Sequence, residues 1–149
     1  MDKGNLLKLA EHLKTKVTKR QFDMEMYRKK RKFFFKKVDT AYKVDRSDCG
    51  SIGCALGWAP FVEGLESQTE DLHYNREYGC WCVHFDKYCE RVFGLYIFHP
   101  EWEWCFSPRW KDVDNTPKGA ARRIEYLVRH GVPEGWRLPD QLDTMYYNC

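Results

Sequence analysis

The sequence predicts an α+β fold, in the form of a single compact, helix-dominated domain with a few short strands. Its 149 residues lie within the usual range for one domain. A composition that is 43% hydrophobic and 16% aromatic is sufficient for a core, and a chain of this size buries about 68–70% of its unfolded surface. Apolar residues recur at helical spacing in several segments of the chain. We therefore expect residues 1–149 to form one domain.

The first half of the chain predicts two helices. A helix is expected over about residues 5–17, because apolar residues recur there every three or four positions: Leu6, Leu9, Leu13 and Val17. A short, buried helix is expected from about 52 to 59 and should stop at Pro60. Gly53 and Gly57 would allow a neighbouring element to approach its backbone closely. Residues 21–27 fit either an extended segment or a helical turn.

The middle of the chain predicts a long surface connection over 63–79, followed by a helix from about Trp81 to Val92 that ends at Gly94. Residues 95–98 are a candidate short strand. Pro100 is expected to open a short helix that ends before Pro108. The tail from 134 to 149 is too apolar for a free terminus and is expected to wrap back onto the domain.

The last helix carries the clearest signals. Thr116 is a suitable N-cap, Pro117 fits the first helical position, and Gly131 followed by Pro133 ends the pattern. The apolar stripe between these ends consists of Ala120, Ile124, Leu127 and Val128. This pattern predicts a helix that packs one face against the core.

Charge is distributed unevenly along the chain. Residues 1–43 carry 14 Lys and Arg against 5 Asp and Glu, whereas residues 44–149 carry 11 against 17. We expect the basic segment 1–43 to pack on the acidic body 44–149. The sequence has no apolar run of the roughly 18–20 residues that a membrane span requires, and no signal-peptide pattern at its start. A protein of the cytoplasm that does not enter a membrane is expected.

Three aromatic residues, 33–35, lie between two basic blocks and form the strongest local charge feature. The cations are Arg28, Lys29, Lys30, Arg31, Lys32, Lys36 and Lys37. Phosphate contacts from these residues, with stacking by the phenylalanines, would suit a nucleic acid. The alternative is ordinary solvated surface or pairing within the protein.

A resemblance to a family spans most of the chain in order. Residues 49–59 read CGSIGCALGWA, Phe93-Gly94-Leu95 follows, and Asp114-Asn115-Thr116-Pro117 precedes the AARRI of 120–124. This pattern resembles a family of small hypothetical proteins of tailed bacteriophages, whose members also fit Phe22-Asp23-Met24. The resemblance implies a phage accessory protein in the bacterial cytoplasm. It implies no catalytic residue and no cofactor.

The start of the last helix is the preferred candidate site. Free backbone N–H groups and the positive end of the helix dipole favour an anion there. The candidate ligand-binding residues, four of them cationic and two with indole rings, are Arg109, Thr116, Lys118, Arg122, Arg123, Trp104 and Trp110. Together they suggest a nucleotide-type ligand. The alternative for Arg122 and Arg123 is a solvated helix face or ion pairs with Asp112, Asp114 or Glu125.

The cysteines offer two further chemistries. Cys80, Cys82, His84 and Cys89 have the donor types of a tetrahedral zinc site, but on the predicted helix they would point in different directions, and the usual spacing is missing. Cys49 or Cys54 beside a helix start could be an activated nucleophile, with a base among His73, His84, His99 and His130. The structural alternative is that these thiols pack as small hydrophobic groups.

The sequence therefore favours a non-enzymatic protein that binds a small, anionic, nucleotide-like ligand and so interferes with a host process such as a defence signal. One alternative is an accessory factor that binds nucleic acid or a host protein through residues 28–37. Another is a cysteine- or zinc-dependent enzyme. No cofactor and no membrane partner are expected, and a homo-oligomer is compatible with the sequence.

Overall fold

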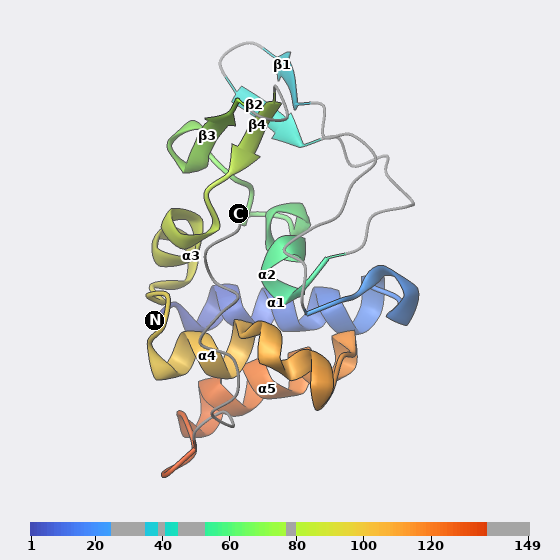
Figure 1. Cartoon of the computed structure of the whole chain (residues 1–149), viewed down its shortest axis with the longest axis vertical. Coiled ribbons are helices and arrows are strands. Elements are labelled where there is room, and N and C mark those ends of the chain that lie inside the picture. The colour runs from blue at the N-terminus through green and yellow to red at the C-terminus, as the bar shows by residue number, and fades with distance from the viewer. Residues whose placement is uncertain (25–34, 39–40, 45–52, 77–79, 137–149) are drawn as a thin grey trace.

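The computed structural model describes residues 1–24, 35–38, 41–44, 53–76 and 80–136 (Figure 1). Its helices are α1 (Lys3–Lys16), α2 (Ala55–Trp58), α3 (Phe85–Phe93), α4 (Pro100–Phe106) and α5 (Pro117–His130). Its strands form two antiparallel pairs, β1 (Phe35–Val38) with β2 (Ala41–Val44) and β3 (Leu72–Asn75) with β4 (Cys80–Val83). The predicted helix-dominated α+β fold is confirmed.

Helix α1 is held at its start and along one face. The Asp2 side chain accepts a hydrogen bond from the Asn5 N–H at 2.9 Å, which caps the helix. The predicted stripe of Leu6, Leu9 and Leu13 is fully buried. This face packs mainly against α5, and α1, α4 and α5 lie together in the lower half of the view in Figure 1. The amphipathic pattern therefore placed this helix correctly.

Helix α2 is central and short. All four of its residues are buried, as predicted, and the α-helix ends before Pro60. It begins at Ala55, later than the predicted residue 52, and the chain continues through Pro60 in a 3₁₀ turn over Ala59–Phe61. Gly53 precedes the helix and forms a parallel bridge with Phe22. Its N–H donates to the Gln21 carbonyl at 3.1 Å. The segment around Phe22 is thus extended at the bridge, and Gly53 allows a strand-like neighbour rather than a helix to approach.

The prediction of a helix from Trp81 is wrong for its first turn. Residues Cys80–Val83 form strand β4, and α3 begins only at Phe85. The predicted surface connection 63–79 is wrong in part for the same reason, because β3 lies within it and pairs with β4. The stop at Gly94 is confirmed, with a positive φ of 61° that suits glycine.

The C-terminal half otherwise follows the sequence pattern, with one exception. Helices α4 and α5 begin at Pro100 and Pro117 as predicted. Residues 95–98 form a turn instead of the expected strand, and Phe98 has a φ of 65°. In the tail, Trp136 contacts Trp104 and Trp110, whereas 137–149 lie outside the described residues. No helix in the described part of the chain has the length and apolar character to cross a membrane.

Candidate functional site

The first turn of α5 is built as its sequence predicts. Thr116 is the N-cap, and its side chain accepts a hydrogen bond from the Gly119 N–H at 3.0 Å. Pro117 occupies the first helical position, where the missing N–H costs nothing. The apolar stripe is buried against the core. This part of the candidate site is therefore rigidly positioned.

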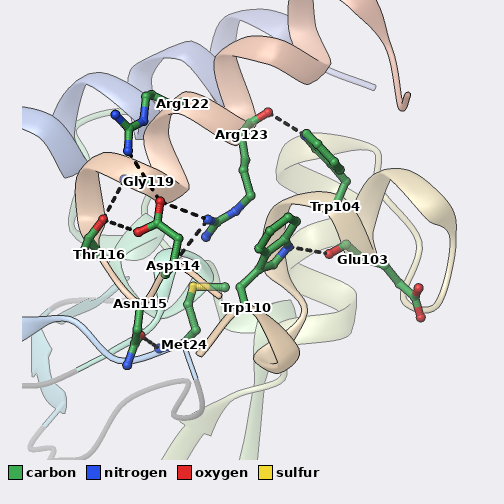
Figure 2. A network of polar contacts seen from close by, with 10 residues as sticks. All are labelled: Met24, Glu103, Trp104, Trp110, Asp114, Asn115, Thr116, Gly119, Arg122 and Arg123. Carbon is green, nitrogen blue, oxygen red and sulfur yellow. Dashed lines mark hydrogen bonds and ion pairs between the residues drawn. The ribbon is translucent and has the colours of Figure 1, made fainter. Parts of the chain in front are cut away.

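The protein's own carboxylate covers this helix start. Oδ1 of Asp114 accepts a hydrogen bond from the Thr116 hydroxyl at 2.6 Å. Its Oδ2 lies so close to Gly119 that a Cβ there would approach it to 1.9 Å. Figure 2 shows the carboxylate between the helix start and the two arginines. The expectation of a bare helix end open to a ligand is wrong, because Asp114 already supplies the negative charge.

Arg122 and Arg123 both reach Asp114, but from different surroundings. The Arg122 Nη2 to Asp114 Oδ2 distance is 3.5 Å, and the Arg122 side chain is 73% exposed. The Arg123 Nη1 is 3.9 Å from the same oxygen and also donates to the Asp114 carbonyl at 3.3 Å. The Arg123 side chain is only 7% exposed. Arg122 is thus a surface cation, and Arg123 belongs to the interior.

Arg123 stacks on an indole inside the domain. Its guanidinium carbon lies 4.2 Å from the centre of the Trp110 ring, which is a cation–π contact. Burial lowers the pKa of Arg123 to about 10, and the charge of Asp114 opposes that shift. Nε and Nη2 have no hydrogen-bond partner. The stacked ring and the single carboxylate only partly replace the water that this cation lost.

The two tryptophans among the candidate ligand-binding residues, Trp104 and Trp110, serve as packing elements. The Trp104 indole N–H donates to the Arg123 carbonyl at 2.8 Å, and the Trp110 indole N–H donates to the Glu103 carbonyl at 3.3 Å. Trp104 makes edge-to-face contacts with Trp110 and Trp136 at centroid distances of 5.5 and 5.0 Å. These three indole rings therefore pack against one another.

An open hollow lies on another side of the same helix start. It has a volume of about 390 Å³ and lies between the segment that follows α1 and the first turn of α5. Its lining consists of Val17, Thr18, Lys19, Thr116, Pro117, Lys118 and Arg122. Three cations and two hydroxyl-bearing residues therefore face one space, and none of the described residues that line it is acidic.

The predicted ligand-binding residues thus divide into two groups. Thr116, Lys118 and Arg122 line the hollow. Trp110 and Arg123 are buried, and the partly buried Trp104 packs against the core. Arg109 is half-buried on the 3₁₀ turn that precedes α5 and is not part of the lining.

Lys19 is the charged lining residue that sequence reasoning missed, and Thr18 beside it was missed as well. Lys19 lies about a hundred positions from Lys118, and only the packing of α1 on α5 brings the two together.

The basic segment with Arg28, Lys29, Lys30, Arg31 and Lys32 lies outside the described residues. Lys36 and Lys37 are on strand β1, where only the backbone register is described. The alternative function based on these residues stays a prediction.

The predicted metal quartet is not assembled. Cys80, Cys82 and His84 follow one another along β4 and its end, but Cys89 is on α3 and fully buried in the core. Within the described residues, no group of three or more His, Cys, Asp or Glu is gathered to hold a metal ion. The helical geometry that argued against the quartet is also wrong, because residues 80–83 form a strand.

Three of the described thiols, those of Cys54, Cys89 and Cys105, are unsuited to nucleophilic catalysis because they are buried. Cys54 caps α2, and its sulfur accepts from the Gly57 N–H at 3.4 Å. Burial nevertheless raises the pKa of Cys54 to about 11, the opposite of the activated thiol considered from the sequence. Burial also raises the pKa of Cys89 and Cys105. Cys49 lies outside the described residues.

Comparison of the chain with known protein families, with curated proteins and with solved structures finds no match. The resemblance to phage proteins accordingly stays a prediction, and the fold and the hollow are the basis for a function.

Proposed function

We propose that the protein binds an anionic, phosphate-bearing ligand in the hollow lined by Lys19, Lys118 and Arg122. The observation that carries the proposal is the convergence of three cations from two distant segments on a hollow whose described lining residues include no carboxylate. A volume of about 390 Å³ lies in the range of roughly 300–1,000 Å³ that is typical of small-molecule sites.

The charges support an anion more than any neutral ligand. Within the described part of the chain, neither Lys19 nor Lys118 forms an ion pair, and Arg122 has only the 3.5 Å contact to Asp114. An incoming phosphate would be held by the two ammonium groups and the exposed guanidinium, with the hydroxyls of Thr18 and Thr116 as additional polar partners. It would not displace Asp114, which stays bound to the helix start.

The biological role follows from this chemistry and from the resemblance to phage proteins. A phage accessory protein in the bacterial cytoplasm that captures a small phosphorylated molecule would lower the concentration of a host signal, such as a defence nucleotide. No catalytic residue is assigned, and the proposal is one of binding by charge and hydrogen bonds.

Isothermal titration calorimetry tests the proposal. The purified chain is titrated with inorganic phosphate, linear nucleotides and cyclic nucleotides. We expect saturable heat with at least one of them and about tenfold or greater weakening in Lys118→Glu and Lys19→Glu, equivalent to about 1.4 kcal/mol or more.

Lys87→Glu is the matched control. It makes the same charge change at an exposed position on α3, away from the hollow, and should leave the affinity unchanged. Absence of heat with every phosphate compound, or equal weakening by Lys87→Glu, overturns the proposal.

A further inference from the structure

The hollow at the start of α5 presents charged groups without an aromatic surface. Its three cations are Lys19, Lys118 and Arg122, and all three residues are exposed. None of the described residues that line the hollow is aromatic, and the apolar part of that lining is Val17 and Pro117. Proteins commonly recognise a nucleobase by stacking it on an aromatic ring. The described lining therefore offers contacts for phosphate groups and no stacking platform for a base.

The indole rings near α5 are directed elsewhere. Trp104 and Trp110 contact each other at a centroid distance of 5.5 Å, and Trp110 also lies against the guanidinium of Arg123. Figure 2 shows the Arg122 side chain pointing away from both rings. A phosphate held by Arg122 is therefore bound without help from these indoles.

The two hydroxyl groups in the lining already have protein partners. The Thr18 hydroxyl donates to Oε1 of Gln21 at 2.8 Å, and the Thr116 hydroxyl donates to Oδ1 of Asp114 at 2.6 Å. A phosphate accepts hydrogen bonds, so these hydroxyls would have to share their protons in order to serve it. They are secondary to the cations, and charge decides how tightly a ligand is held.

The balance of charge around the hollow favours more than one phosphate. Among the described residues, Asp114 is the one carboxylate within ion-pair distance of these cations, at 3.5 Å from Arg122, and it also serves Arg123. A cyclic phosphodiester carries a single negative charge, whereas a terminal phosphate carries about 1.5–2 and each further phosphate in the chain adds to it. A chain of phosphates therefore matches three cations better than one phosphate does.

We propose that the ligand of this hollow carries a terminal chain of two or three phosphates and is recognised through these phosphates, whatever base is attached. This inference rests on the proposed function and names the class of ligand for the same site. Nucleoside diphosphates, nucleoside triphosphates and inorganic triphosphate share this chemistry. Because the hollow is open, the rest of such a ligand extends into solvent.

Calorimetry across a phosphate series tests the inference. The purified chain is titrated with cyclic AMP, AMP, ADP, ATP, GTP and inorganic triphosphate, in the absence of divalent cations that would neutralise the phosphates. We expect the affinity to rise about threefold or more with each added phosphate. ATP, GTP and inorganic triphosphate should agree within about threefold. Raising the salt concentration from about 0.05 to about 0.3 M should weaken ATP more than AMP, because screening acts on every charge.

Neutral variants separate contact with the ligand from a structural role. Lys19→Gln, Lys118→Gln and Arg122→Gln should each lower the ratio of ATP affinity to AMP affinity by about threefold or more, because a loss of positive charge affects the more highly charged ligand most. A general loss of stability does not change this ratio. Lys87→Gln is the matched control, since it removes an exposed charge on α3 and should leave the ratio unchanged.

The outcomes distinguish this inference from the proposed function. Absence of binding by every phosphate compound would overturn both. Equal affinities for AMP, ADP and ATP, tighter binding of cyclic AMP than of ATP, or a difference of about tenfold between ATP and GTP would leave anion binding in place and overturn the phosphate-chain inference. A ratio that falls equally in Lys87→Gln would also overturn it.

Discussion

Arg122 and Arg123 are neighbours in the chain, yet they lie in opposite environments at the start of α5. The Arg122 side chain is 73% exposed and borders the hollow, whereas that of Arg123 is 7% exposed and stacks over Trp110. Successive helical residues point about 100° apart, so one turn of helix presents one cation to solvent and one to the core (Figure 2).

The difference shows which cation can bind a ligand. Arg123 has lost its water and depends on Asp114 and Trp110, so its contribution is to the stability of the helix start. Arg122 keeps its water and shares the hollow with Lys19 and Lys118. A surface cation of this kind contributes little to folding and remains available to an anion.

The largest expected effect comes from removing the interior arginine. Arg123→Ala leaves a space beside Trp110 and removes a partner from Asp114, so we expect the free energy of unfolding to fall by about 3 kcal/mol. Urea denaturation measures the change. Arg122→Ala is the control and should change stability by no more than about 0.5 kcal/mol. Similar losses in the two variants would contradict the distinction between them.

Alkaline pH should lower the stability of the protein, because thiols are buried in its interior. Burial raises the pKa of Cys54 from 9.0 to about 11. Because this pKa is higher in the folded state, the stabilisation is complete below pH 9.0 and is lost as the pH rises towards about 11. Between these two pKa values the free energy of unfolding falls by about 1.4 kcal/mol per pH unit for each such thiol. Arg123 changes the free energy of unfolding in the opposite direction. Burial lowers its pKa to about 10, so above that pH it loses its proton in the folded state first and stability rises with pH.

Urea denaturation at about pH 8 and about pH 10 measures this effect, with an expected loss of about 1–2 kcal/mol for each of the three buried thiols. A thiol reagent at neutral pH provides the second readout, since Cys54, Cys89 and Cys105 should not react in the folded chain. Rapid reaction of these three thiols under native conditions would show that the interior is open to solvent.

A methyl group at Gly119 should disturb Asp114, the carboxylate that both the exposed Arg122 and the buried Arg123 contact. A Cβ at this position would lie 1.9 Å from Oδ2 of Asp114, so Gly119→Ala must push the carboxylate away from its Thr116 hydrogen bond. We expect a loss of about 1–2 kcal/mol despite the higher helix propensity of alanine. In an Asp114→Ala background the same substitution should be neutral or stabilising, which a double-mutant cycle measures. Equal effects in both backgrounds would exclude the steric explanation.

The smallest effect on stability is expected for the hollow. Lys118→Glu changes an exposed charge at the start of α5, where the helix dipole favours the negative side chain. We expect the free energy of unfolding to change by less than about 0.5 kcal/mol while phosphate binding is lost. Thermal denaturation with and without the ligand checks both parts. A large loss of stability would place Lys118 among the structural residues.

Local sequence patterns were sufficient to predict the helices whose end signals and apolar stripe both lie within or directly beside the helix. Thr116, Pro117 and Gly131 mark the two ends of α5 within a few residues of where they act. The hairpin of β3 and β4 was missed, because Trp81 also fits the helical spacing of Phe85 and Tyr88. Pairing with β3 supplies hydrogen bonds to Cys80–Val83 that no local pattern reveals.

The sequence by itself determined the fold class, the long helices and the set of cations around α5, because these depend on residue types and short spacings. The tertiary structure alone decided that Lys19 joins Lys118, that Asp114 closes the helix start, and that Arg123 is buried. Each of these depends on side chains brought together by the packing of separate elements. Whether a charge is solvated or paired is a property of its surroundings, and those surroundings form only when the chain has folded.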